Sequence, residues 1–231
     1  MKSKAAVAVF LGFILSIFSF AQEKFVALTF DDGPNPVFLK KALPYFRDQK
    51  IKVTFFIIGA EAVNYPKLIA LESNNGHEIE NHTYGHVCLV KPNSKWNLCK
   101  NISIDKAVWQ IEQTNKIVFD ITGQRPMFLR PPFFAMTQER KSELQKITGI
   151  TILNHGSDSV GSLDWIYNSP MPIVSNVKKI IKERNFNSCI IVFHERLNTL
   201  LALPDIINFL RNNKYIFVRL DEFEKEERGR K

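Results

Sequence analysis

The sequence predicts a single α/β domain built on parallel strands. Short apolar runs rich in β-branched and aromatic residues alternate six or seven times with helical patterns, and no linker rich in Pro, Gly or Ser interrupts them. No internal repeat is present. Such alternation is typical of strands joined by helical crossovers, which form either a barrel or an open doubly wound sheet. A chain of 231 residues is long enough for one domain of either kind.

The first three predicted strands are short runs of apolar and β-branched residues. Asn35 is expected to cap the first helix, with Pro36 at its first position, and Gly59 ends the second strand. Residues 87–102 form a long polar loop, and loops of that length are often functional. In chain order we expect a strand over 25–30, a helix over 36–48, a strand over 53–58, a helix over 59–73 and a strand over 77–80.

The second half of the chain continues the alternation. Ser103 is expected to cap a helix with apolar residues at helical spacing, and Gly123 ends that helix. The charged tail, 221–231, is expected to fray. In chain order we expect a helix over 103–121, a strand over 127–130, a helix over 137–147, a strand over 149–153, a polar loop over 156–165, a helix over 173–185, a strand over 189–193, a helix over 199–212 and a strand over 215–218.

Residues 1–21 have the composition of a secretory signal peptide. Two lysines precede an unbroken apolar stretch over 5–21, and Ser19 and Ala21 are the small residues of a cleavage site before Gln22. The alternative is a retained membrane anchor, because the apolar stretch approaches the length that spans a bilayer. The signal-peptide interpretation predicts a secreted or periplasmic protein with no stable membrane span after cleavage.

The expected mature domain, residues 22–231, is basic. The whole chain has a net charge of +8, and cleavage would remove two of its lysines. A basic exported protein suits anionic surfaces such as a cell wall or acidic glycans. We expect no nucleic-acid partner, since the chain carries no nucleic-acid motif and is expected to be exported. The oligomeric state does not follow from the sequence.

The three cysteines divide into a candidate pair and a single thiol. Cys88 and Cys99 lie in one polar stretch and could pair in an oxidising compartment, which would stabilise the fold by roughly 3 kcal/mol in the chain-entropy model. Cys189 opens an apolar run and is expected to be a buried thiol. No two cysteines have Cys-x-x-Cys spacing, which argues against a zinc site made of cysteines.

Two adjacent acids, Asp31 and Asp32, follow the first predicted strand. Neighbouring side chains of a strand point to opposite faces, so both carboxylates can turn toward one cleft only where the strand gives way to a loop. The alternative is a solvated turn, because Asp-Gly and Gly-Pro are ordinary turn formers.

Asp32, His82 and His86 form a candidate metal site. The two histidines are four residues apart with Gly85 between them, so a helical turn or a tight loop could direct both imidazoles at one ion. Two histidines and one carboxylate leave coordination positions open for water, as catalytic zinc sites do. The alternative for the histidine pair is a solvated loop.

Three later strand ends each carry one further candidate. Arg130 could hold a carboxylate by bidentate bonds or form a surface salt bridge. Asp164 precedes Trp165 at the end of a polar loop, and the alternative is a turn acid beside a core tryptophan. His194 follows an apolar strand and could equally be a satisfied strand-end histidine; His77 is expected to be structural. In a parallel α/β barrel, side chains at separate strand ends meet on the face that carries active sites.

These candidates lie in five segments that follow one another in a fixed order. The segments are Thr29-Phe30-Asp31-Asp32-Gly33-Pro34, His82-Thr83-Tyr84-Gly85-His86, Arg130-Pro131-Pro132-Phe133, Asp164-Trp165 and His194. They resemble the motifs of the polysaccharide deacetylases, carbohydrate esterase family four, which include the nodulation-type chitooligosaccharide deacetylases. The resemblance covers about residues 24–220 and implies a distorted (β/α) barrel with about seven parallel strands. It also implies removal of N-acetyl or O-acetyl groups from glycans with a divalent metal.

The resemblance implies a role for each matching position. Asp31 would be the catalytic base and His194 the general acid, with Arg130 orienting the base and Asp164 tuning the acid. The implied ligands of a divalent metal, usually Zn²⁺, are Asp32, His82 and His86. The positions implied to bind substrate are Phe133, through its backbone N–H, and Trp165 and Val192, around the acetyl methyl group.

The sequence departs from the family pattern in three motifs. Phe133 stands where Tyr is common, Gly161 stands where an acid often precedes the fourth motif, and Glu195 follows the last histidine where Asp is usual. These changes affect the tuning of the site more than the reaction. Trp96, in the loop over 87–102, could stack on a sugar ring or pack within the loop, and packing is slightly favoured.

The residues together predict a metal-dependent deacetylase that hydrolyses N-acetyl groups of a cell-wall-type glycan, either peptidoglycan or a chitin-like oligosaccharide. A metal can polarise an acetyl carbonyl, a carboxylate can take a proton from water, and a charged histidine can protonate the leaving amine. One alternative is an O-acetyl xylan esterase of the same fold. Two others are a non-catalytic glycan-binding pseudoenzyme, which would need neither base nor acid, and an exported α/β protein without metal.

Overall fold

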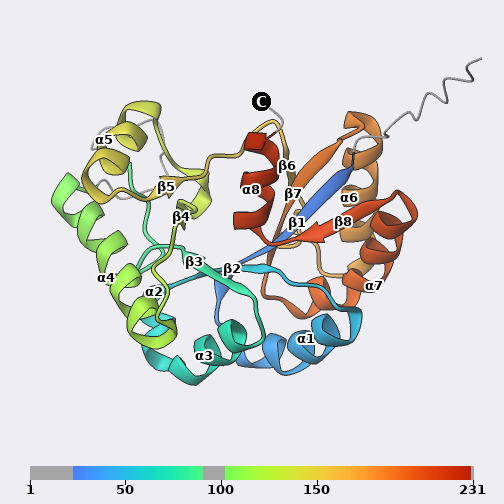
Figure 1. Cartoon of the computed structure of the whole chain (residues 1–231), viewed down its shortest axis with the longest axis horizontal. Coiled ribbons are helices and arrows are strands. Elements are labelled where there is room, and N and C mark those ends of the chain that lie inside the picture. The colour runs from blue at the N-terminus through green and yellow to red at the C-terminus, as the bar shows by residue number, and fades with distance from the viewer. Residues whose placement is uncertain (1–22, 91–101, 230–231) are drawn as a thin grey trace, which may run out of the picture.

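The computed structural model of the chain describes residues 23–90 and 102–229, and these residues form one domain around a single sheet (Figure 1). Seven parallel strands follow one another in the order β5-β4-β3-β2-β1-β7-β6, and an eighth strand pairs with β1. The sheet curls into a half-barrel, which confirms the predicted barrel class. The strands are β1 (Lys24–Gly33), β2 (Thr54–Ile57), β3 (Glu78–Asn81), β4 (Phe128–Leu129), β5 (Thr151–Ile152), β6 (Ser159–Gly161), β7 (Ser188–His194) and β8 (Tyr215–Val218).

Helices connect the strands, as the alternation predicted. Asn35 caps the first helix through its side chain, and Gly123 ends the fourth in a left-handed conformation, both as expected. No helix of the described residues is long and apolar enough to cross a bilayer, and the predicted signal peptide lies outside them. The helices are α1 (Pro36–Gln49), α2 (Gly59–Asn64), α3 (Pro66–Asn74), α4 (Ile104–Thr122), α5 (Gln138–Thr148), α6 (Pro170–Arg184), α7 (Leu197–Asn212) and α8 (Leu220–Gly229), with a 3₁₀ turn η1 (Pro132–Phe134).

Strand β1 is the centre of the sheet. It pairs with β7 along seven residues, from Phe25 opposite Ser188 to Asp31 opposite His194. Its first half also pairs with β8 and its second half with β2. This register places Asp31 and His194 side by side at the carboxyl ends of two neighbouring strands.

The two faces of β1 belong to two different hydrophobic clusters. Val26 and Leu28 join a large outer cluster that packs the sheet against α1, α6 and α7. Phe25 and Ala27 join a smaller inner cluster, which lies on the concave face. Because side chains alternate along a strand, Asp31 continues the inner face beyond Ala27 and points into the half-barrel.

Helix α8 fills the concave side of the sheet, which corrects the prediction of a frayed tail. Figure 1 shows it between β4–β5 on one side and β6–β7 on the other. Its Phe223 is 1% exposed and packs in the inner cluster with Phe56, Phe128 and Ile190. Most residues of the tail are charged, so its composition does not indicate that one face of the helix is buried. That face covers the inner cluster, which would otherwise be exposed because the half-barrel does not close.

Two further expectations were wrong in detail. The helix expected over 59–73 is two helices, because the chain breaks at Tyr65 and Pro66 takes the first position of α3. The polar loop expected over 156–165 contains the short strand β6, which pairs with β7 at the edge of the sheet.

The cysteines partly follow the prediction. Cys189 is a free buried thiol, and burial raises its pKa to about 12. Cys88 is disulfide-bonded. Cys99 and Trp96, together with the rest of 91–101, lie outside the described residues.

Candidate active site

The two acids after β1 point in different directions. Asp32 has φ of +68°, in the left-handed region that non-glycine residues adopt at a cost. This residue therefore interrupts the alternation of the strand at the point where the sequence predicted a loop. Asp31 stays on the inner face of the barrel, while Asp32 turns toward the loop that follows β3.

Asp31 forms a buried ion pair with Arg130, which follows β4. One guanidinium nitrogen donates to Asp31 Oδ1 at 2.6 Å and to Thr29 Oγ1 at 2.9 Å. The guanidinium also lies 4.0 Å from the ring centroid of Phe56. Arg130 is 2% exposed and Asp31 is 3% exposed. The pairing is therefore internal and not a surface salt bridge, but it joins one nitrogen to one oxygen and is not the bidentate pair that the sequence predicted. Removing either partner would leave an uncompensated buried charge.

Asp32, His82 and His86 come together as the candidate metal site. His82 Nε2 lies 3.4 Å and His86 Nε2 lies 3.1 Å from Asp32 Oδ1. One ligand atom from each of the three residues lies within 4.8 Å of the others. A tight loop rather than a helical turn brings the histidines together, with left-handed backbone at Thr83 and His86.

The hydrogen bonds around this triad fit a cation. His82 Nδ1 lies 2.7 Å from the carbonyl oxygen of Arg130, which can only accept, so Nδ1 carries the proton and Nε2 presents a lone pair. That lone pair faces Asp32 Oδ1, a buried acceptor with no hydrogen-bond partner among the described residues. Two nitrogen lone pairs and an ionised carboxylate form a donor set that suits Zn²⁺.

His194, at the end of β7, is paired with Asp164. Its Nδ1 lies 2.7 Å from Asp164 Oδ1, and its backbone N–H donates to Asp164 Oδ2 at 2.7 Å. The hydroxyl of Thr199, near the start of α7, also donates to Asp164 Oδ2. Burial lowers the pKa of His194, but Asp164 and the nearby Asp31 raise it by more, so the net direction is upward. For Asp164 the effects are opposite: burial raises its pKa, but its hydrogen bonds to His194 and Thr199 lower the pKa by more, so the net direction is downward.

The three predicted substrate-binding residues lie around these pairs. Phe133 has φ of +60° in η1, is 59% exposed, and its ring centroid lies 4.9 Å from that of His86. Val192 lies in β7 two residues before His194 and therefore on the same face of the strand. Trp165 directly follows Asp164 and is 57% exposed, so it is not a core tryptophan.

Comparison with known proteins identifies the family. The family model described as polysaccharide deacetylase matches residues 20–153, more than half of the chain. The chain belongs to the polysaccharide deacetylase family. A peptidoglycan-N-acetylglucosamine deacetylase of Bacillus cereus is 30% identical to this chain over 204 residues, which are 87% of this chain and 88% of that protein.

Other members of the polysaccharide deacetylase family are longer. The peptidoglycan-N-acetylglucosamine deacetylase PgdA of Listeria monocytogenes is 29% identical over 199 residues, which cover 86% of this chain and only 38% of that protein. Among solved structures, the Bc1960 peptidoglycan N-acetylglucosamine deacetylase matches with a TM-score of 0.73 and 30% identity, over 86% of each chain.

The structure of this polysaccharide deacetylase family member adds polar groups that the sequence analysis did not single out. Thr29 accepts from Arg130, and its place two residues before Asp31 in the strand was a usable signal of a shared face. Thr199 binds Asp164, but its sequence context, an ordinary helix start, gives no such signal. His77 is buried and structural, as expected, and its Nδ1 accepts from the backbone N–H of Val53.

A surface cavity of about 450 Å³ opens beside Asp164. It lies where the N-termini of α1 and α7 approach the loop that follows β6. Its lining combines amide, phenol and guanidinium groups with two acids, including Asn35, Asp164, Tyr167, Asn168, Glu195 and Arg196.

Proposed function

We propose that this chain is a secreted, metal-dependent deacetylase that hydrolyses N-acetyl groups of a cell-wall glycan, either peptidoglycan or a chitin-like oligosaccharide. The observation that carries the proposal is the convergence of three preorganised groups at the strand ends. These groups are the Asp31–Arg130 ion pair, the triad at Asp32, and the His194–Asp164 pair. The printed names of the similar proteins, which are peptidoglycan deacetylases, support the choice of glycan.

Asp32, His82 and His86 would hold the metal, for which Zn²⁺ is our proposal. A divalent cation in such a site supplies Lewis-acid polarisation of a carbonyl and lowers the pKa of water toward ~7. The chain itself supplies the orientation of its ligands. The carbonyl of Arg130 fixes the His82 tautomer, so the same segment that carries Arg130 prepares both the metal ligand and the predicted base.

Asp31 would act as the general base. Its Oδ1 is held by Arg130, which keeps this carboxylate apart from the metal ligands and leaves Oδ2 to accept a proton from water. The barrel interior around the pair is buried, which strengthens the interaction relative to water.

His194 would act as the general acid. An amine is a poor leaving group unless it is protonated. Cleavage of the amide bond of an N-acetyl sugar therefore needs a proton donor. Asp164 holds His194 at Nδ1, so Nε2–H is the proton that faces the site. The backbone N–H of Phe133 would help to stabilise the oxyanion, and Trp165 and Val192 would line the pocket for the acetyl methyl group.

We also propose that residues 1–21 are a signal peptide and that 22–231 is the exported domain. The lysines, the apolar stretch and the small residues before Gln22 support this assignment. N-terminal sequencing of the protein recovered outside the cytoplasm tests it. A mature N-terminus at Gln22 is the expected result, and an uncleaved chain in the membrane fraction would favour a retained anchor.

The decisive experiment measures acetate release by the purified mature chain loaded with Zn²⁺. Peptidoglycan, chitooligosaccharides and acetylated xylan are compared in parallel, with metal content determined on the same sample. We expect release from the N-acetylated glycans and one bound ion per chain. Release from xylan alone would identify an O-acetyl esterase, and glycan binding without any release would identify a pseudoenzyme.

A further inference from the structure

Glu195 follows the predicted acid His194, and the proposed chemistry gives it no role. Its backbone N–H donates to the carbonyl oxygen of Asp31 at 3.2 Å. Its side-chain Oε2 accepts from the backbone N–H of Asn35 at 2.6 Å. One residue of the β7–α7 connection therefore bonds to both ends of the loop 31–35, which contains the predicted base and the predicted metal ligand Asp32.

The carboxyl group of Glu195 also packs directly against this loop. A Cβ atom built on Gly33 would lie 1.9 Å from Glu195 Oε1, a distance that no pair of real atoms occupies without a bond. A side chain on Gly33 would therefore displace this carboxyl group. The contact is close enough that any shift of Glu195 must move the loop or open a gap beneath it.

The loop that Glu195 contacts is one that needs support. Asp32 adopts a left-handed backbone, which costs a non-glycine residue free energy and persists only where surrounding contacts define it. The side chain of Asn35 caps α1, and its backbone N–H donates to Glu195. The loop is thus fixed by α1 on one side and by Glu195 on the other.

The surroundings of Glu195 favour its uncharged form. Glu195 is 4% exposed, and the nearby charge of Asp32 adds to the effect of burial in raising its pKa; Glu195 in turn raises the pKa of the fully buried Glu72 of α3. Glu195 Oε1 and both carboxyl oxygens of Glu72 have no hydrogen-bond partner among the described residues. Burial raises the pKa of both residues, that of Glu195 to about 8, against the lowering effect of the Asn35 N–H on Glu195. A neutral carboxyl group can hold the loop without placing a second negative charge beside Asp32.

We propose that Glu195 is a positioning residue, which holds the two ends of the loop 31–35 and thereby sets the carboxylates of Asp31 and Asp32. The inference rests on the proposed role of Asp32 as a metal ligand. It also gives a reason for a glutamate after His194, because the side chain of an aspartate would be one methylene too short to reach the N–H of Asn35.

The test compares three substitutions of Glu195 in the mature chain. Zn²⁺ affinity of the metal-free protein is measured by competition with a chelator, and kcat and KM are measured on the N-acetylated glycan from which the parent protein releases acetate. Glu195→Ala should weaken Zn²⁺ binding by about tenfold or more, the range that follows loss of groups that orient metal ligands. Glu195→Gln keeps an acceptor for Asn35 and cannot ionise, so it should remain within about threefold of the parent. Glu195→Asp should resemble Glu195→Ala.

Glu78→Ala is the matched control, because Glu78 is also buried and also accepts from a backbone N–H, that of Asp221, away from the loop. It should lower stability without changing Zn²⁺ affinity. If Glu195→Ala does not fold, Glu195→Asp carries the comparison. Absorption of bound Co²⁺ reports the ligand geometry of the folded variants, and should change for Glu195→Asp but not for Glu78→Ala.

Two results would overturn the inference. Folded Glu195→Ala or Glu195→Asp with the Zn²⁺ affinity and Co²⁺ absorption of the parent would show that the loop does not depend on this residue. Impairment of Glu195→Gln to the level of Glu195→Ala would show that the bond to Asn35 is not what matters. A parent protein that binds neither ion would overturn the proposed function as well, so the two failures are distinguishable.

Discussion

Asp31 and Asp32 are adjacent in the chain but contact different partners, so substituting each should have a different effect. Asp31→Asn keeps an oxygen for Arg130 and leaves the triad untouched, but it removes the proton acceptor. We expect kcat to fall by about 10²- to 10⁴-fold with Zn²⁺ still bound. His82→Ala removes a ligand and should lose both activity and metal. Acetate release and metal content of each variant give the measurement.

The exposed Asp48→Asn substitution is the control for Asp31→Asn, because Asp48 contacts only Arg47 at the surface among the described residues. It should change neither readout. Undiminished acetate release by Asp31→Asn would remove the base assignment, whereas retained metal in His82→Ala would remove the ligand assignment.

The pair of His194 and Asp164 predicts a pH dependence. The pKa of His194 is raised above its usual value, chiefly because the Asp164 bond outweighs the opposing effect of burial. The protonated acid is therefore present below this raised pKa and is lost as pH rises through it. Asp164→Asn removes the negative charge, so the alkaline decline of kcat should move to lower pH. A profile of kcat against pH measures the shift.

Asp158→Asn is the matched control, since Asp158 lies on the other side of the short strand β6 and its backbone carbonyl, rather than its carboxylate, accepts from Ile190. Its kcat profile should coincide with that of the parent. An alkaline limb that stays in place in Asp164→Asn would mean that a group other than His194 sets it.

The site residues were predictable from sequence because each is a chemically distinctive side chain at the end of an apolar run. Asp31, Arg130 and His194 all fall at such ends, and a parallel sheet brings strand ends together. Thr199 and Glu195 were not assigned, because their partners Asp164 and Asn35 are distant in the chain and nothing local marks the contact. Long-range partners of ordinary residues depend on strand register, which the pattern of a single strand does not determine.

At the scale of elements, His77 joins α1 to the β2–β3 region. Its imidazole packs edge-on against Phe46 and Phe55, and its Nδ1 accepts from the Val53 N–H. Burial, with Lys52 and Arg219 nearby, lowers the pKa of His77 from 6.5 to about 4. The unfolded chain therefore binds an extra proton between these two values. The contribution of neutral His77 to the free energy of unfolding is therefore fully present above pH 6.5. It is lost as pH falls from 6.5 toward 4 and amounts to about 3 kcal/mol.

His77→Asn isolates this contribution, because asparagine offers an acceptor to Val53 but does not titrate. The free energy of unfolding, measured by urea denaturation from pH 7 to pH 4, should fall more steeply in the parent than in the variant. Parallel curves would contradict the prediction.

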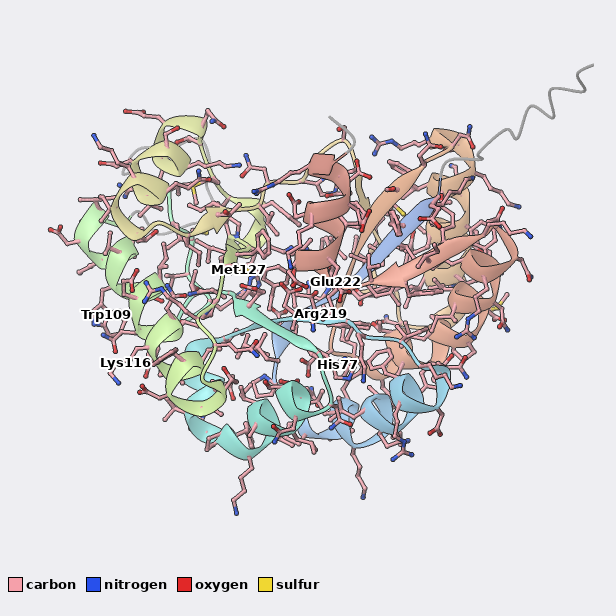
Figure 2. The ribbon with its side chains drawn as sticks, in the orientation of Figure 1. His77, Trp109, Lys116, Met127, Arg219 and Glu222 are labelled. Carbon is pink, nitrogen blue, oxygen red and sulfur yellow. The ribbon has the colours of Figure 1, made fainter. Side chains whose placement is uncertain are left out.

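Figure 2 labels His77 and Arg219, one of the two basic residues whose charge lowers the pKa of His77. The guanidinium of Arg219 is also paired with Glu222 of α8, at 3.6 Å.

Helix α8 predicts a second effect at this scale. Phe223 is its buried aromatic side chain in the inner cluster, so Phe223→Ala should destabilise the fold by about 3–5 kcal/mol. Phe119→Ala, at a residue that is 52% exposed on α4, is the control and should change stability by about 0.5 kcal/mol or less. Chemical denaturation of both variants measures the difference. Equal stability of the two would mean that α8 is not part of the core.

The elements themselves were predicted unevenly, for identifiable reasons. Caps such as Asn35 and Ser103 act locally, so the sequence located the starts of α1 and α4. The strand β6 was missed because it is three residues long and gains its pairing from β7 rather than from its own composition. The buried face of α8 was missed because its largest apolar contact, Phe223, is surrounded by charged residues.

At the scale of the whole molecule, the triad connects segments that are far apart in the chain. Asp32 follows β1 at the centre of the sheet, whereas His82 and His86 follow β3. The three ligands meet only when β1, β2 and β3 are paired, so the unfolded chain offers no preformed site. An ion bound there should therefore stabilise the folded state by mass action, by about 2.7 kcal/mol when its free concentration is 100 times the Kd.

For a chain of 231 residues, that stabilisation corresponds to a rise in Tm of roughly 5–10 °C. Thermal unfolding is followed with the chelated protein and again after Zn²⁺ is added. His82→Ala should show no rise, whereas His155→Ala should rise as the parent does, because His155 contacts Phe134 and lies outside the triad. An equal rise in His82→Ala would place the stabilising ion elsewhere, because loss of one of three ligands should weaken binding at this site.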